Sequence, residues 1–507
     1  MRGVKAGKGG VAGSLLWKIL EGYGTQGVTL LVSIVLARLI SPEEYVFVAL
    51  VMAVVNVANV LVQTGFGSAL IQREDVTDAD FSAVCALNLL VSALLYLVLF
   101  FAAPAVAAFY RMERLTGMLR LGGVSLFFGA VLSVENALCG RRMAFRALCL
   151  CAFGAAAISG ALGVALAYMG FGAWALVVSN IVQNAGMMLL LGAALGWRPV
   201  RGLAGADGEA MEGPGWSPGM QLRRLGALFS FGWKLLCAGI LDTVYTNVYE
   251  LFIGKVFVPE SLSYFNRANQ FPRLVANNMG GVIQAVMLPV YSREQGNPDN
   301  VRAWVRKTVR TGAFISFPLM AGMAAAARPM VLVLLGANWE KTAGFLQLLC
   351  LGYAFWPLDT ANLQAMNALG RSDLFLKLEI AKKVLGVAGL VLSVPFGVYG
   401  VVGVRTLIEV VCFALNAAPN RKLLGYGIGR QFADILAPVL CSLAMGAAVY
   451  ALGAFGILRW GVAATFALQV AAGVAIYLAL SVLWQRESLG AVWGALAQLL
   501  LRRQNLV

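Results

Sequence analysis

The sequence predicts an all-α membrane protein that crosses the bilayer many times. Hydrophobic residues make up 60% of the 507 residues, charged residues only 12%, and the mean hydropathy is +0.79. Apolar stretches of about 20 residues, the length that spans a hydrocarbon core of ~30 Å, recur about fourteen times. A soluble domain of this length does not bury so much apolar surface, so the fold class is a multi-pass helical one.

Each predicted span is expected to be a helix, because a backbone that faces lipid must satisfy its own hydrogen bonds. The total of about 14 transmembrane helices is an even number. In chain order, the predicted helices cover residues 14–40, 44–71, 81–109, 116–138, 147–169, 173–195, 225–254, 261–291, 304–327, 343–369, 374–394, 397–418, 432–453 and 460–483.

Lys and Arg residues are concentrated at the N-terminus and in every second connection. Arg2, Lys5 and Lys8 precede the first predicted span, and Arg141 and Arg142 follow the fourth. By the positive-inside rule, both termini are predicted to lie in the cytoplasm, with the chain in a bacterial cytoplasmic (inner) membrane. The same distribution accounts for most of the formal net charge of +15, so no nucleic-acid partner is expected.

Three motifs recur in the same order, offset by roughly 217 to 231 residues, at equivalent predicted helix ends: 38–43 with 255–260, 136–141 with 367–371, and 171–174 with 396–399. Six helices separate the copies, so the repeats share one orientation and are related about an axis along the membrane normal. Between them, a Gly- and Pro-rich stretch is typical of a flexible linker. The predicted organisation is two pseudo-symmetric six-helix lobes at 1–196 and 225–431, joined by a cytoplasmic linker at 197–224. Two additional helices with a cytoplasmic tail follow at 432–507.

The eighth predicted helix carries the most informative polar residues. Its polar side chains share one helical face, since they follow the spacing i, i+4, i+7, i+11 and i+18: Asn266, Gln270, Arg273, Asn277 and Gln284. Arg267 and Arg273 have no acid within one turn, and a charge in a bilayer costs roughly 2.5–3.5 kcal/mol. Such residues usually face a water-filled interior, and the rigid donor fork of Arg suits phosphate, which predicts an anionic cargo.

Other predicted spans carry shorter polar stripes that are candidates for the same cavity. For the amides, an equally weighted interpretation is structural, because Asn and Gln often hold membrane helices together. Arg405 and Glu409 lie one turn apart and are interpreted as a structural or gating pair. Coupling to Na⁺ or H⁺ through Glu21, Asp242 or Asp359 is a further hypothesis. The remaining cavity candidates are Lys18, Glu21, Asn56, Asn59, Lys234, Asp242, Asp359 and Asn362.

Several motifs that resemble catalytic or metal sites are better explained by structure, so no catalysis, cofactor or metal is expected. The chain has no histidine, the commonest general base and metal ligand. A GxGxxG match at 22–27 lies inside a predicted span, with no preceding strand. Asp78 and Asp80 form a DxD where a helix cap is expected. Cys149 and Cys151, in a CxC spacing, are interpreted as small buried apolar residues.

Four stretches resemble the polysaccharide-transporter family, which includes Wzx-type O-antigen flippases and colanic-acid or teichuronic-acid exporters of the multidrug/oligosaccharidyl-lipid/polysaccharide exporter superfamily. The stretches are 36–71, 140–146, 264–272 and 362–371. The resemblance implies two six-helix lobes forming a V around a central cavity. It also implies a cargo of undecaprenyl-diphosphate-linked oligosaccharide, turned from the cytoplasmic to the periplasmic leaflet, with membrane lipids and polysaccharide polymerase or export components as candidate partners. The linker at 197–224 is longer than in typical members.

Three other functions are alternatives to the transport of a lipid-linked oligosaccharide. A drug/cation antiporter would share the fold but favour an acidic cavity. A lipid II flippase would differ only in its glycan. A membrane glycosyltransferase or polymerase would be expected to show an acidic catalytic pair and a sizeable periplasmic loop, and the sequence shows neither.

Overall fold

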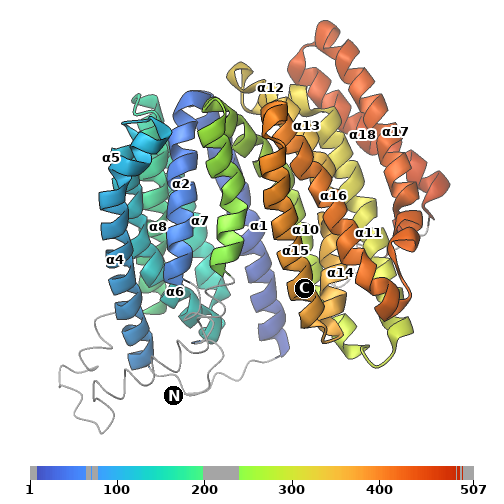
Figure 1. Cartoon of the computed structure of the whole chain (residues 1–507), viewed down its shortest axis with the longest axis horizontal. Helices are drawn as coiled ribbons and strands as arrows, with labels where there is room; N and C mark the ends of the chain where they lie inside the picture. The colour runs from blue at the N-terminus through green and yellow to red at the C-terminus, as the bar shows by residue number, and fades with distance from the viewer. Residues whose placement is uncertain are drawn as a thin grey trace. The chain divides into compact units, whose positions relative to one another are not determined.

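The computed structural model describes residues 8–63, 70, 78–197, 239–486, 488–490 and 494. Within these residues the chain is helical and contains no strand (Figure 1). Nine of the described helices are long and apolar enough to cross a membrane, or ten if one bent pair counts as a single span. These observations confirm the predicted multi-pass helical class. The predicted number of about 14 spans is consistent with them, although it is not itself confirmed.

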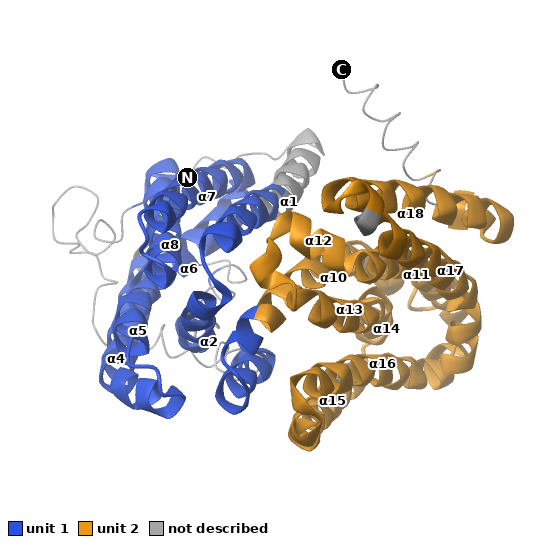
Figure 2. Cartoon of the chain, turned by 90° about the horizontal axis from the view of Figure 1, so that it is seen from above, with its two compact units in different colours: residues 1–263 blue, residues 264–507 orange. Residues whose placement is uncertain are grey.

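The chain divides into two compact units, Met1–Ser263 and Tyr264–Val507 (Figure 2). The first unit also holds a helix over 239–256, in which the carbonyl of Leu251 accepts from the Tyr110 hydroxyl at 3.1 Å. The internal repeat assigns this helix to the C-terminal lobe, and that assignment stays a prediction. The other helices of the first unit are α1 (Lys8–Leu39), α2 (Pro42–Gln63), α4 (Asp78–Tyr110), α5 (Leu115–Gly123), α6 (Ser125–Arg142), α7 (Phe145–Tyr168) and α8 (Ala173–Leu195).

Small residues let the helices of the first unit approach one another closely. A Cβ built at Gly160 of α7 would lie 2.5 Å from Cγ2 of Val32 in α1, and one at Gly163 would lie 2.8 Å from the hydroxyl of Ser179 in α8. Membrane helices associate through such close packing, since lipid is as apolar as the side chains. The Ser179 hydroxyl also donates to the carbonyl of Ser159 at 2.8 Å, which joins α8 to α7.

The boundary between the two units falls within the first turns of α10, so the second unit begins at Tyr264 of this helix. A 72° bend separates α11 from α12, and Pro357 follows a break between α13 and α14. The helices of this unit are α10 (Glu260–Arg293), α11 (Pro298–Ala325), α12 (Ala327–Leu334), α13 (Thr342–Tyr353), α14 (Trp356–Ala368), α15 (Ser372–Leu392), α16 (Gly397–Leu424), α17 (Ile428–Trp460) and α18 (Val462–Trp484), with short 3-10 turns at Ala337–Trp339 and Val394–Phe396.

The last two helices, α17 and α18, pack against α11 (Figure 1). Pro318 lies inside α11 and has no N–H, so the carbonyl of Phe314, four residues earlier, loses its helical donor. The hydroxyl of Tyr477 in α18 donates to this carbonyl at 2.8 Å, and the Tyr477 and Phe314 rings pack at 5.4 Å. An unsatisfied carbonyl is costly in a bilayer, so this bond fastens α18 to α11 where the ladder is broken.

Two corresponding positions of the predicted internal repeat make matching contacts, one in each unit. In the first unit, the ring of Trp174 at the start of α8 lies 3.1 Å from a Cβ built at Gly117 of α5. In the second, the ring of Tyr399 at the start of α16 lies 3.0 Å from a Cβ built at Gly344 of α13. Each aromatic residue belongs to one copy of a repeated motif, and each packs on a glycine of the corresponding earlier helix. This correspondence supports the duplication inferred from the sequence.

Candidate functional site

Helix α10 presents a polar face, as its sequence spacing predicts. Arg273, Asn277 and Gln284 are exposed, while Asn266 and Gln270 are partly buried. The helix continues to Arg293 despite Pro272 and Pro289 within it, so the polar face extends along a single element. Buried apolar residues such as Phe265 and Ala276 anchor its other side.

Arg267 is held in place by an amide and an aromatic ring. Its Nη1 donates to Oε1 of Gln270, one turn later, at 2.9 Å. Its guanidinium carbon lies 5.7 Å from the ring centre of Trp339, a buried residue in the 3-10 turn between α12 and α13. Tyr264 meets the Trp339 ring edge-on at 6.1 Å, and the Lys341 ammonium lies 5.9 Å from the Tyr264 ring. Two cations and two aromatic rings therefore form one cluster, in which the guanidinium is oriented but partly exposed.

Arg267 and Arg273 lie at different depths along α10. At 1.5 Å per residue, Arg267 is about 10 Å from the start of the helix at Glu260, and Arg273 is about 20 Å from it. Arg267 therefore lies nearer one end of the predicted span than its middle. The two guanidinium groups are separated by almost two turns along the helix, so they offer successive positions for an anion.

A second group of charges surrounds Tyr353 of α13. The Tyr353 hydroxyl donates to Oδ1 of Asn269 in α10 at 2.8 Å, and Arg405, Arg273 and Glu409 act on it electrostatically. The Arg405 guanidinium also lies 5.3 Å from the ring of Phe265. Arg405 and Glu409 act on each other electrostatically, which fits their interpretation as a structural or gating pair.

A buried amide network connects α14, α16 and α17 inside the second unit. Asn362 has no exposed surface, and its Nδ2 donates to Oε1 of Gln431 at 2.9 Å. Its Oδ1 accepts from Asn420 at 2.7 Å and from Gln431 at 2.8 Å. The carboxylate of Asp359, also buried, accepts from Asn416 at 3.1 Å. These contacts favour the structural interpretation of Asn362, whose polar atoms are directed at neighbouring helices.

The remaining predicted site residues belong to the first unit. Asn56 is exposed on α2, and Asn59 of the same helix is partly buried. Asp242 is exposed on the 239–256 helix, and its carbonyl accepts from Thr246 at 2.8 Å. Asp78 is the first residue of α4, where a cap was expected. Three predicted site residues fall outside the described side chains: Lys18, Glu21 and Lys234.

The sequence of this polar helix falls inside a match to a known protein family. The model of the polysaccharide biosynthesis protein family matches residues 35–344, which is more than half of the chain and includes all of α10. The chain belongs to this family.

Several named proteins are similar to this chain over most of its length. The teichuronic acid biosynthesis protein TuaB of Bacillus subtilis is 24% identical over 435 residues, covering 84% of this chain and 85% of TuaB. The lipopolysaccharide biosynthesis protein WzxC of Escherichia coli is 20% identical, covering 86% of each chain. Among solved structures, the lipid II flippase MurJ in an inward closed conformation matches with a TM-score of 0.73 at 14% identity, covering 93% of this chain and 99% of MurJ. The fold is therefore MurJ-like.

Two buried acids were not among the residues predicted from the sequence. Glu135 of α6 is 2% exposed, and its Oε2 has no hydrogen-bond partner among the described residues. Asp434 of α17 is buried and binds Arg306 and Arg310 of α11. An isolated acid inside an apolar span was the available signal for Glu135. Asp434 lies 124 residues from its nearer partner along the chain, so spacing could not have paired them.

Proposed function

We propose that this protein flips an undecaprenyl-diphosphate-linked oligosaccharide from the cytoplasmic to the periplasmic leaflet for cell-surface polysaccharide biosynthesis. The observation that carries the proposal is the pair of arginines at two depths along α10, Arg267 bonded to Gln270 and Arg273 on the polar face. Membership of the polysaccharide biosynthesis protein family and the MurJ-like fold support it, since MurJ is named as a lipid II flippase.

The chemistry of such a cargo fits the α10 residues. A diphosphate offers several anionic oxygens, which the two-donor fork of Arg267 or Arg273 can bind with charge-assisted hydrogen bonds. Asn266, Gln270 and Asn277 add amide donors and acceptors on the same face, and these suit sugar hydroxyls. In alternating access, the glycan and diphosphate cross in contact with this face while the polyprenyl tail stays in lipid. We propose that the two arginines bind the diphosphate in succession as it crosses.

The proposal includes an orientation and a domain division. Both termini lie in the cytoplasm of a bacterial cell, and the chain is in its cytoplasmic membrane, as the Lys and Arg distribution indicates. The moving parts are the six-helix lobes at 1–196 and 225–431, joined by the 197–224 linker. The polymerase and export components that use the same glycan are the proposed partners on the periplasmic side.

We propose further that the protein catalyses no reaction. A drug/cation antiporter is disfavoured because the two arginines of α10 would repel a cationic substrate. Incubation of the purified protein with nucleotide sugars and lipid-linked glycan should give no new covalent product. Turnover that disappears in the Asp78→Ala, Asp80→Ala double variant would instead identify a glycosyltransferase.

Binding of undecaprenyl diphosphate to the purified protein tests the role of Arg267. Each lost charge-assisted hydrogen bond costs roughly 1.5–3 kcal/mol, so Arg267→Gln should raise Kd by about 10- to 100-fold. Arg267→Lys should recover only part of the affinity, because an ammonium replaces a two-donor fork. In cells, Arg267→Gln should reduce surface polysaccharide while membrane insertion and expression stay near those of the wild type.

Arg371 provides a matched control in the same unit. It is an exposed arginine that pairs with Asp373 at 2.9 Å between α14 and α15, and its hydrogen bond lowers the pKa of Asp373 to about 2. Arg371→Gln should leave the Kd unchanged, and undecaprenol, which lacks phosphate, should not discriminate between wild type and Arg267→Gln. Equal affinity of wild type and Arg267→Gln for the diphosphate would remove Arg267 from the cargo site.

A further inference from the structure

Glu135 lies on the apolar side of α6. The residue is 2% exposed, and its Oε2 has no hydrogen-bond partner among the described residues. Val131 and Leu138, one turn before it and one turn after it, share its helix face and belong to a single buried apolar cluster. That cluster also contains Phe81 and Cys85 of α4. The Glu135 carboxyl is therefore enclosed where α6 packs against its neighbours.

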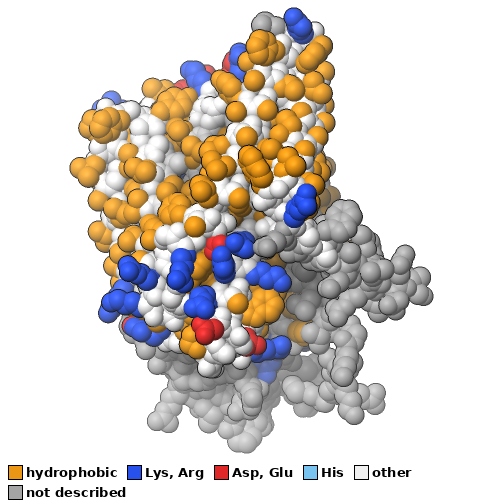
Figure 3. Space-filling model, turned by 90° about the vertical axis from the view of Figure 1, so that its right-hand side faces the viewer, with side chains coloured by type: hydrophobic (Ala, Val, Ile, Leu, Met, Phe, Trp, Pro, Cys, Tyr) orange, Lys and Arg blue, Asp and Glu red, His pale blue; other side chains and the backbone are white. Residues whose placement is uncertain are grey.

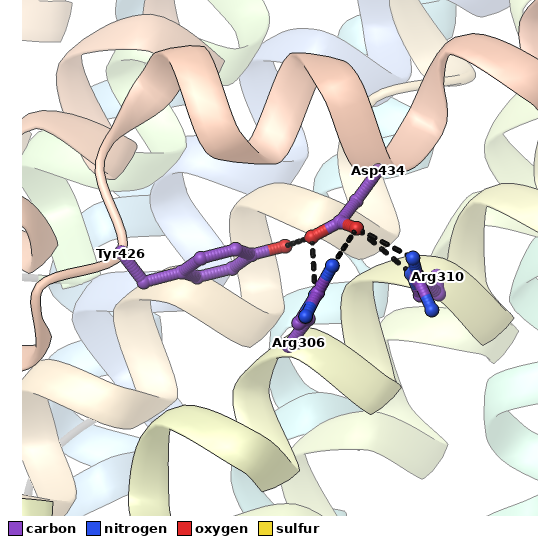
Figure 4. Close-up of polar contacts among 4 residues, drawn as sticks. All are labelled: Arg306, Arg310, Tyr426 and Asp434. Atoms are coloured by element: carbon purple, nitrogen blue, oxygen red, sulfur yellow. Dashed lines mark hydrogen bonds and ion pairs between the residues drawn. The ribbon is translucent and has the colours of Figure 1, made fainter. Parts of the chain in front are cut away.

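Asp434 of α17 shows how the protein holds a buried carboxylate (Figure 4). Arg306 donates from Nε to Oδ2 and from Nη2 to Oδ1, both at 2.7 Å. Arg310 donates from Nε to Oδ1 at 2.9 Å, and the Tyr426 hydroxyl donates to Oδ2 at 2.8 Å. Figure 3 shows this side of the second unit, where Lys and Arg side chains gather beside a band of hydrophobic ones. Asp434 thus has the cations and donors that a buried charge needs, and it serves to join α17 to α11.

Helix α8 leaves room for the Glu135 carboxyl. A Cβ built at Gly192 of α8 would lie 2.8 Å from Oε1 of Glu135 and 3.8 Å from its Cδ. Real Cβ atoms do not approach an oxygen as closely as 2.8 Å, so a larger residue at position 192 would displace the carboxyl. The side chain is therefore seated in a space that the neighbouring helix provides.

The predicted repeat indicates that packing alone does not require an acid at this position. Glu135 directly precedes Asn136 in the motif at 136–141, and Met366 directly precedes Asn367 in the corresponding motif at 367–371. Met366 is fully buried in α14, so an apolar side chain occupies the equivalent place in the second copy. An acid inside a membrane span is costly, and such acids often form part of proton pathways. Glu135 is therefore a candidate for a chemical role.

The ionisable groups that face Glu135 from other helices are thiols. Glu135 acts electrostatically on Cys85 of α4 and Cys151 of α7, which are both buried. Helix α8 contains no ionisable side chain. The ionisable side chains of α2 lie in its first turn, where Glu44 pairs with Arg114 at 3.1 Å.

The basic side chains of α5 and α6 bind backbone carbonyls. Arg141 and Arg142 lie six and seven residues after Glu135, about 9 to 10 Å along the helix axis. They donate to carbonyls at 3.1 and 2.9 Å, and Arg120 of α5 donates to a carbonyl of α4 at 3.2 Å. Oε2 of Glu135 receives no donor from the described residues, whereas a buried carboxylate needs several.

A carboxyl group in these surroundings holds a proton, because a bare charge in an apolar interior is much more costly than the neutral acid. The O–H bond can break, with the proton passing to water, only when water reaches the carboxylate that is left. Helices α4, α6 and α8 must separate near Glu135 for this to happen. The conformation described here is thus the one that retains the proton.

We propose that Glu135 is a proton-binding site, and that release of its proton is coupled to opening of the first unit between α4, α6 and α8. The acids that the sequence suggested for ion coupling are placed differently, since Asp242 is exposed and Asp359 accepts from Asn416. The inference does not depend on the identity of the cargo.

The first measurement asks whether Glu135 carries a proton. Full-length protein in nanodiscs is studied by infrared difference spectroscopy between mildly acidic and alkaline pH, because a neutral carboxyl has a carbonyl band that a carboxylate lacks. The wild type should lose such a band at alkaline pH, and Glu135→Gln should lack this band at every pH. Glu340→Gln, which replaces an exposed acid paired with Arg328 at 2.8 Å, should keep it.

The second measurement asks whether proton release opens the first unit. Hydrogen exchange of the α6 amides is followed over the same pH range and corrected for the chemical exchange rate. If opening releases one proton, the opened population rises about tenfold per pH unit, so the corrected rate should do the same in the wild type. In Glu135→Gln the corrected rate should not depend on pH. Peptides from α18 provide an internal control, whose corrected rate should be independent of pH in both proteins.

Glu135→Met provides a second variant that keeps the site neutral. It copies the residue at the equivalent position of the predicted repeat, Met366, so it should fold even if Gln is poorly tolerated. Its corrected α6 exchange should be as independent of pH as that of Glu135→Gln.

Three results would overturn the proposal. The first is the absence of a carboxyl band that disappears in Glu135→Gln. The second is the same pH dependence of α6 exchange in the wild type and in Glu135→Met. The third is a Glu135 band that persists at alkaline pH with no change in exchange, which would make this residue a permanently neutral part of the packing. Neither measurement uses undecaprenyl diphosphate, so failure here leaves the flippase proposal untouched, and the reverse also holds.

Discussion

Replacement of Ser316 by Ala should weaken the second unit at the break between α13 and α14. Pro357 interrupts this stretch, and Leu358 N donates to the carbonyl of Phe355 and not to that of Ala354. The fully buried hydroxyl of Ser316 in α11 donates to the Ala354 carbonyl at 2.7 Å. Hydrogen bonds between membrane helices contribute ~0.6 kcal/mol on average and up to ~1.7 kcal/mol. Because Ser316→Ala leaves a buried carbonyl unsatisfied, we expect a loss near the upper value.

The assay is equilibrium unfolding in mixed micelles with an increasing fraction of denaturing detergent, followed by tryptophan fluorescence. Ser159→Ala is the matched control, because Ser159 is also a buried serine within a membrane helix. Its hydroxyl donates back to the carbonyl of Ala156, in its own helix, at 3.2 Å, so its loss should cost under ~0.5 kcal/mol. If the two variants lose the same free energy of unfolding, the Ser316 bond does not compensate for the break in the ladder.

Two other substitutions test the packing of each unit. Gly160→Ile should destabilise the first unit by roughly 1–3 kcal/mol, because the new side chain would overlap α1. Gly27→Ala should be nearly neutral, because no atom lies within 4 Å of the new Cβ. The measurement is the unfolding midpoint of each variant in mixed micelles. Asn362→Leu should cost roughly 1–3 kcal/mol, since it leaves Gln431 and Asn420 without their partner. The fraction of Asn362→Leu protein that stays folded should bind undecaprenyl diphosphate as tightly as the wild type. A loss of affinity in this folded fraction would instead assign Asn362 to the cargo site.

Much of the fold could be predicted from composition and local pattern. Every predicted span has a helical counterpart among the described residues, because the bilayer imposes one solution on any long apolar segment. The helix starts at the repeated Phe-Gly motifs were also predictable. Gly172 and Gly397 both have positive φ, 53° and 73°, a region that favours glycine, so the motif marks the same turn in both copies. The breaks within spans were less predictable, since the break beside Pro357 and the bend after Ala325 depend on packing as well as on sequence.

The candidate site, like the fold, could be predicted from the sequence only in part. The polar face of α10 followed from helical spacing, because the period of the helix alone decides which side chains share a face. The spacing could not show that Trp339, 72 positions beyond Arg267, supplies the ring beside that guanidinium.

By itself, the sequence determined a multi-pass helical protein with a polar face on one helix, since these features depend on interactions between residues close in the chain. It also predicted a repeated lobe. Only the tertiary structure decided which polar residues are satisfied inside a unit and which remain exposed. It placed Asn362 in a buried amide network, and it held Arg306 and Arg310 on Asp434. The physical reason is that hydrogen-bond and ion-pair partners are chosen by proximity in space, and packing brings together groups that are far apart in the chain.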